Sequence, residues 1–124
     1  SRFSATKSKA HKMAKAKLSL SANPTFKAVV GIPVPGVTAT SPVEFVFKHR
    51  TRTALKTWRE SIDLDADGVT VEHIMDMASG WDLDDAFGAE AIGAMLEEYP
   101  ASGIVILVRY MQEMTDARLG NSAR

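Results

Sequence analysis

Carboxylates at alternating positions are the first feature of this chain that could do chemistry. Asp63, Asp65 and Asp67, followed by Gly68, match the first half of a calcium-binding loop, in which alternating oxygen ligands precede a glycine at a sharp turn. The twelfth position of such a loop supplies a bidentate glutamate, but here it is Ile74. Because the coordination shell then cannot close, we interpret this segment as an acidic turn between helices and expect no metal site. Weak calcium association at its surface stays open as an alternative.

A run of cations precedes the acidic part of the chain. Lys48, Arg50 and Arg52, with Lys56 and Arg59 one and two helical turns further on, could hold phosphate groups. The run lacks interleaved aromatic residues and a recognisable helix for reading bases. We therefore expect these cations to pair with carboxylates, within the chain or between copies of it. Nucleic-acid binding through residues 48–59 remains the alternative function.

His73 and Asp76 lie one helical turn apart and could act as a general base with its orienting carboxylate. No candidate nucleophile is near them in the sequence, and no glycine-rich phosphate loop follows a predicted strand. The chain contains no cysteine, which excludes thiolate nucleophiles and disulfides. We therefore expect no catalytic residue, no cofactor and no enzymatic activity.

Other residues could serve recognition instead of catalysis. Trp81 follows a glycine in an acidic loop that includes Asp84 and Asp85, and it is either a core residue between two helices or an exposed anchor for a partner. Methionines gather in the second half of the chain, where they fill the core or form an adaptable apolar surface. Among them, Met111 and Met114 are the candidates for partner contact.

The net charge of zero conceals a strong separation of charge along the chain. Residues 1–59 carry twelve cations and one carboxylate, a net +11, whereas residues 60–124 carry three cations and fourteen carboxylates, a net −11. Such opposed halves favour self-association, in which copies stack head to tail.

Apolar periodicity predicts an α+β fold, in which an N-terminal antiparallel element of about three short strands precedes about four helices. Period-two alternation indicates strands around residues 17–20, 26–32 and 43–47. After Arg50 the period becomes helical. Four stripes are expected: Leu55, Trp58 and Ile62, capped by Thr51 or Thr53; Val71, Ile74, Met75 and Ala78, ended by Gly80; Ala91, Ile92, Met95, Leu96 and Tyr99, ended by Pro100; and Ile104, Leu107, Val108, Met111 and Arg118.

Length and composition predict one globular domain over residues 15–121. The chain has 124 residues, 45% of them hydrophobic and 24% charged, which is typical of a folded soluble domain. Residues 1–14 are basic and aperiodic, and we interpret them as a disordered arm or an expression remnant. The longest apolar run, residues 104–108, is far shorter than the ~20 residues of a membrane span, so no membrane partner is expected.

Three ordered stretches resemble the tail assembly chaperones of long-tailed, siphovirus-type phages. They are residues 45–55 (FVFKHRTRTAL), residues 80–87 (GWDLDDAF), and residues 96–100 (LEEYP) continuing through 104–110 (IVILVRY) to 117–121 (ARLGN). The resemblance covers about residues 17–121. It implies an α+β domain without catalysis that coats the tape measure protein and keeps it soluble during tail morphogenesis.

The resemblance also implies partners and a location. The tape measure protein is the expected client, with a homo-oligomer and the tail tube protein as further candidate partners. The expected location is the cytoplasm of the bacterial host, and the protein is not expected in the mature virion.

Overall fold

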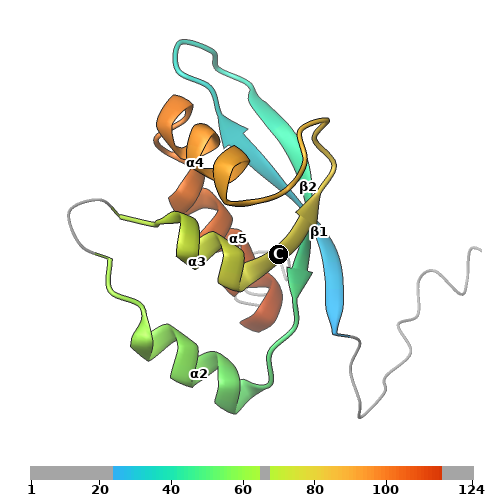
Figure 1. Ribbon diagram of the computed structural model, residues 1–124, viewed down its shortest axis with the longest axis vertical. Helices are drawn as coiled ribbons and strands as arrows, with labels where there is room; N and C mark the ends of the chain where they lie inside the picture. Colours follow the sequence, from blue (N-terminus) through green and yellow to red (C-terminus); the bar gives the residue numbers. More distant parts are fainter. Residues whose placement is uncertain (1–23, 65–67, 116–124) are drawn as a thin grey trace, which may run out of the picture.

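The chain begins its described structure with a β-hairpin. A computed structural model describes residues 24–64 and 68–115. Strands β1 (Thr25–Pro33) and β2 (Thr40–Lys48) pair antiparallel along their whole length (Figure 1). Gly36, in the connecting turn, has φ +83°, a left-handed conformation that glycine adopts without steric cost. The two strands predicted around residues 26–32 and 43–47 are thereby confirmed.

The third strand lies where the sequence placed the end of a helix and the start of an acidic loop. Strand β3 (Ala78–Trp81) pairs antiparallel with β2, so the sheet order is β1-β2-β3. The prediction that a helix runs through Ala78 and ends at Gly80 was wrong, because the helix ends at Met77. Pairing with the free edge of β2 satisfies the backbone of this segment, and Gly80 packs against Val46 of β2.

Four helices complete the described fold: α2 (Arg52–Ser61), α3 (Val71–Met77), α4 (Ala89–Glu98) and α5 (Ser102–Thr115). Figure 1 shows α3, α4 and α5 gathered on one side of the sheet, with α2 at one end of the molecule. The predicted α+β class is therefore confirmed. The strand predicted around residues 17–20, the arm at 1–14 and Arg118 lie outside the described residues.

The core lies between the inner face of the sheet and helices α3 to α5. Alternate residues are buried there, as period-two alternation predicts: Ala28, Val30 and Ile32 of β1, and Val43, Phe45 and Phe47 of β2. The largest fully buried side chains are Phe45, Phe47, Ile74, Met77, Ile92, Ile106 and Tyr110. This aromatic and aliphatic cluster fixes the positions of the helix ends and loops at the surface.

Helix α2 attaches to this core through few side chains. Thr51 caps the helix by accepting a hydrogen bond from the Ala54 backbone N–H. Of the two caps that the sequence offered, Thr51 or Thr53, the first is confirmed. Leu55 and Trp58 are its buried residues, which confirms the predicted stripe. The Trp58 ring packs edge-on to Tyr110 at 5.7 Å, and its Nε1–H donates to Asp76 at 3.1 Å.

Helix α5 buries Leu107 as predicted, but two other residues of the predicted stripe are exposed. Ile104 and Val108 were expected in the core, but they are 48% and 46% exposed. Residues 103–108 are apolar on all sides, so periodicity could not identify the inner face. Gly103 determines which face points inward, because any other residue there would place a Cβ only 2.8 Å from the Cβ of Val69 and 3.1 Å from Leu96 Cδ2. The start of the helix can pack this closely only through a residue without a side chain.

Candidate functional site

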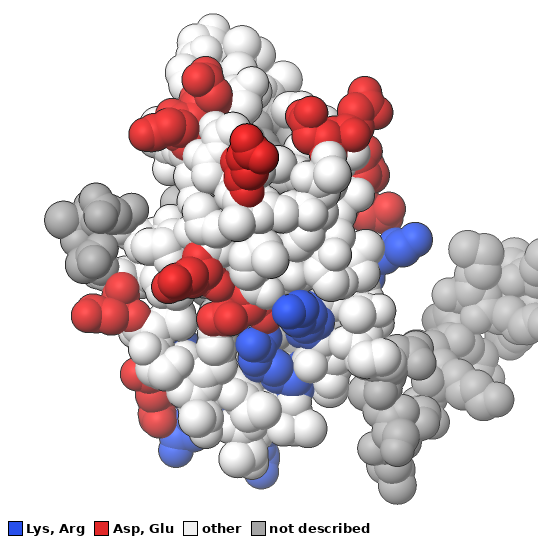
Figure 2. All heavy atoms as spheres, viewed as in Figure 1, with Lys and Arg blue, Asp and Glu red and all other residues white. Residues whose placement is uncertain are grey.

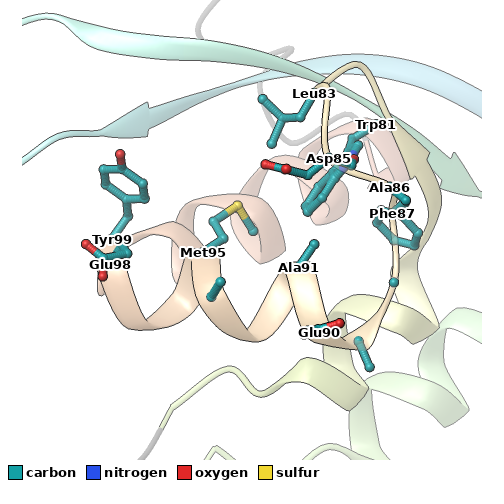
Figure 3. A pocket seen from close by; sticks show the side chains of 13 residues that line it. Trp81, Leu83, Asp85, Ala86, Phe87, Glu90, Ala91, Met95, Glu98 and Tyr99 are labelled. Atoms are coloured by element: carbon teal, nitrogen blue, oxygen red, sulfur yellow. The ribbon is translucent and has the colours of Figure 1, made fainter.

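A groove lies between helix α4 and the segment that leads into it (Figure 3). Its volume is about 710 Å³. The residues that line it are Trp81, Leu83, Asp85, Ala86, Phe87, Gly88, Ala89, Glu90, Ala91, Ala94, Met95, Glu98 and Tyr99. We call this feature the α4 groove.

Trp81 forms one wall of the α4 groove and is held rigidly there. Its indole Nε1–H donates to the backbone oxygen of Asp85 at 2.7 Å. Its ring lies edge-on to Phe45 at 5.9 Å and to Phe87 at 5.0 Å. The side chain is half-buried, so it both packs against the core and faces the groove. Its packing against the core agrees with the first of the two roles that the sequence left open, and the role of a partner anchor stays a prediction.

The segment that carries Trp81 is tied to the sheet at its base. The Asp82 backbone N–H donates to the Glu44 backbone oxygen at 3.0 Å. In return, the Glu44 backbone N–H donates to the Asp82 carboxylate at 3.0 Å. This pair of hydrogen bonds extends the β2–β3 pairing by one step beyond Trp81, so the groove wall starts from a fixed point.

Helix α4 contributes small residues and one methionine to the floor. Ala91 and Ala94 line the groove with short side chains, as does the mostly buried Met95, which Figure 3 shows on the same helix as Ala91. Gly88 is the N-cap of the helix and provides no side-chain cap. Because these side chains are short, a partner could approach the helix closely.

The groove has an acidic rim. Residues 81–99 contain six carboxylates and no Lys or Arg, and three of these carboxylates, Asp85, Glu90 and Glu98, line the groove. Among the described residues, none of these three is in an ion pair. Figure 2 shows acidic side chains over the part of the molecule that holds α4 and its preceding segment, whereas most Lys and Arg in this view lie lower, towards α2.

Of the predicted recognition residues, the structure brings two together in the groove. Trp81 and Asp85 both line it, while Asp84 is exposed in the same segment. Met111 and Met114 lie elsewhere, half-buried on α5 against the core. Met95 is the methionine that lines the groove, and the sequence suggested it as part of a helical stripe and as one of the gathered methionines, without singling it out.

Arg50 has a structural environment that its sequence context did not reveal. Its guanidinium lies 4.8 Å from the centre of the Trp58 ring and donates through Nη1 to the Tyr110 hydroxyl at 2.9 Å. The Tyr110 hydroxyl in turn donates to the Lys48 backbone oxygen at 2.7 Å. Arg50 is therefore half-buried, and its contacts join β2, α2 and α5.

This network also affects a titratable group. Burial raises the pKa of the Tyr110 hydroxyl above its ordinary value, while the hydrogen bond and the positive charge of Arg50 partly oppose the rise. The neutral hydroxyl is the form that donates to the backbone of Lys48.

The remaining cations of the basic run are arranged differently. Lys48 donates through Nζ to the backbone oxygen of Met75 at 3.0 Å. Arg52, Lys56 and Arg59 are exposed on α2. Within the described residues the one ion pair joins Arg109 to Glu113, so the predicted pairing of the basic run with carboxylates inside the chain is not found there.

His73 and Asp76, the candidate base and its carboxylate, are not hydrogen-bonded to each other in the described part of the chain. The Nδ1 of His73 accepts from the Thr70 backbone N–H at 3.0 Å, as part of the cap of α3. Asp76 accepts from the Trp58 indole instead. Of the acidic turn, residues 65–67 lie outside the described residues. In the part that the structure describes, no cluster of His, Asp or Glu is placed to hold a metal ion.

Within residues 24–64 and 68–115, no single helix has the length and apolar character to cross a membrane. Helices α4 and α5 together reach that length and composition, but they are bent by 113° at their junction. Both contribute residues to the core.

The chain folds as a small α+β domain whose surface carries the partly apolar α4 groove. The family model described as phage tail assembly chaperone matches residues 13–121. The chain therefore belongs to the phage tail assembly chaperone family, as its motifs indicated, and it acts in tail assembly through binding to tail proteins. No curated protein and no solved structure matches the chain.

Proposed function

We propose that this tail assembly chaperone binds the tape measure protein of a siphovirus-type phage and keeps it soluble until the tail tube forms around it. Membership of the family, together with the apolar α4 groove, is the observation that supports this proposal. A tape measure protein is a long helical chain whose apolar stripes are unburied before assembly, which makes it prone to aggregate. A protein that covers such stripes lowers the concentration of the aggregating species by mass action.

The α4 groove suits this task through its composition. Trp81 and Phe87 line it with half-buried aromatic rings, and Leu83 and Tyr99 add exposed apolar surface. The carboxylates around the groove keep the outside of a complex charged, which favours solubility. The groove is therefore the surface on which we place the tape measure protein, called the client below.

Coating an elongated client needs more than one copy of the chaperone. We propose that copies associate through opposed charges, with the exposed cations of α2 (Arg52, Lys56 and Arg59) facing carboxylates of a neighbouring copy. A head-to-tail contact that does not close into a ring makes an open chain. The protein would do this in the cytoplasm of the bacterial host and leave before the virion is mature, with the tail tube protein as the component that displaces it.

Co-expression tests the proposal directly. The tape measure protein encoded in the same tail gene cluster is expressed with and without the chaperone, and the soluble fraction of the client is measured. We expect the client to be soluble and to co-purify with the chaperone only when both are present. A client that is equally soluble alone, or that does not co-purify, would refute the proposed function.

A further inference from the structure

We propose that the α4 groove recognises an amphipathic helix whose apolar face is flanked by Lys and Arg side chains. This inference rests on the proposed function, because it names the chemistry of the client segment that the groove binds. Three features of the groove support it: its size, its acidic rim and the position of its tryptophan.

The size of the groove indicates a helix-in-groove mode of binding. A volume of about 710 Å³ accommodates a few large side chains and not a folded domain. An amphipathic helix presents such side chains at positions i, i+3 or i+4, and i+7 along one face. Ala91 and Ala94 on the floor have little side chain to obstruct the approaching backbone, so a second helix can lie close to α4.

The charge of the groove selects the flanks of that helix. The carboxylates of Asp85, Glu90 and Glu98 line the groove, and within the described residues none of them is in an ion pair. The whole segment 81–99 carries a net −6, with no cation of its own. An acidic partner would be repelled, whereas Lys and Arg beside the apolar stripe would meet complementary charge.

Trp81 is already positioned for contact before a partner arrives. The hydrogen bond to the Asp85 backbone and the edge-on packing with Phe45 and Phe87 limit its motion. An anchor that is ordered in the free protein loses less entropy on binding, and tryptophan is common among residues that dominate binding energy.

Synthetic peptides test the inference without the natural client. One peptide of about 15 residues carries leucines at i, i+3, i+4 and i+7 with lysines elsewhere, and its partner carries glutamates in place of the lysines. Binding of each to the full chain is measured by titration calorimetry. We expect the lysine peptide to bind at least about tenfold more tightly at low salt, with the difference shrinking as salt screens the charges. Equal affinity for both peptides would overturn the inference.

Two variants locate the binding to the groove. Ala94→Arg places a long side chain over the floor and should weaken binding of the lysine peptide by about tenfold or more. Its matched control is Ala54→Arg, the same change at an exposed position of α2, which should leave binding unchanged. If both variants bind as the wild type does, or if both lose binding equally, the groove is not the site.

A third variant addresses the acidic rim. The combination Asp85→Asn, Glu90→Gln and Glu98→Gln removes the three lining charges while keeping the size of each side chain, and the backbone oxygen that accepts from Trp81 is untouched. We expect this variant to bind the two peptides with similar affinities. Retention of the full preference for lysine would show that the rim does not select charge and would refute this part of the inference.

The outcome is separable from that of the proposed function. If wild-type chaperone solubilises the tape measure protein and Ala94→Arg does so equally well, the function stands and the groove is not where the client binds. If the wild type fails to solubilise the client but binds the lysine peptide through the groove, the recognition chemistry stands and the function fails.

Discussion

Trp58 holds helix α2 against the rest of the domain, and we predict that Trp58→Ala is strongly destabilising. The side chain is 8% exposed and is one of only two buried residues on the helix, the other being Leu55. Its ring contacts Tyr110 and the guanidinium of Arg50, while its indole nitrogen donates to Asp76. Truncation removes all of these contacts at once.

The magnitude follows from these contacts. Replacing a buried tryptophan by alanine costs about 3–5 kcal/mol in unfolding free energy, which includes the cavity left behind. The edge-on ring pair and the cation–π contact contribute roughly 0.5–1.5 and 0.5–1 kcal/mol of the interactions lost. Trp58→Phe keeps a ring in place but loses the indole donor, and because Asp76 is exposed and can turn to water, it should cost only about 1–2 kcal/mol.

Urea unfolding followed by far-ultraviolet circular dichroism measures both variants. Thr57→Ala is the matched control, because Thr57 is the exposed neighbour on the same helix and its truncation should change stability by less than about 0.5 kcal/mol. Hydrogen exchange should show faster exchange for the amides of α2 in Trp58→Ala than for those of the sheet. A loss below about 1 kcal/mol for Trp58→Ala would show that this residue does not anchor α2.

Gly103→Ala should destabilise the domain by about 1–3 kcal/mol in urea unfolding, because the added Cβ would lie 2.8 Å from a side-chain carbon of Val69. Gly93→Ala, where a Cβ has room, should instead stabilise the domain by about 0.5–1 kcal/mol. The reverse order of stabilities would refute the close approach of α5. Because the pKa of Tyr110 is raised in the folded protein, the unfolded chain loses the hydroxyl proton first, at a pH of about 10. The free energy of unfolding should therefore fall as pH rises above about 10. Tyr110→Phe should reduce this fall in pH-dependent unfolding, and an unchanged alkaline profile would contradict the assignment. Arg52→Glu combined with Lys56→Glu should weaken self-association in sedimentation experiments without loss of the fold, because both residues are exposed. The wild-type oligomer should also weaken as salt rises from ~0.05 to ~0.5 M. An oligomer that is insensitive to both changes would refute the electrostatic contact.

Local patterns in the sequence were sufficient for several elements. Period-two alternation identified β1 and β2, because one face of a hairpin must be buried and the other is wet. Thr51 was among the predicted caps of α2, since its hydroxyl supplies an acceptor that the first turn lacks. The end of α4 before Pro100 followed from the missing backbone donor of proline.

Recognition residues were predictable only in part. Trp81 and Asp85 stood out because a tryptophan in an acidic loop is unusual outside a regular stripe. The alanines and Met95 that complete the groove carry no such signal, because each is an ordinary residue of an amphipathic helix. Arg50 looked like one more cation of an exposed run, since nothing local indicates that Tyr110, sixty residues away, accepts its hydrogen bond.

Three decisions belonged to the tertiary structure alone. Residues 78–81 became a strand because the free edge of β2 offers hydrogen bonds to this segment, which the helical spacing that ended at Ala78 could not reveal. Helix α5 took its inner face from the close contact at Gly103, since an all-round apolar segment has no preferred face of its own. The α4 groove exists because the segment after β3 is tied to Glu44 and passes over α4, and a hollow between two segments is a property of their packing and not of either sequence.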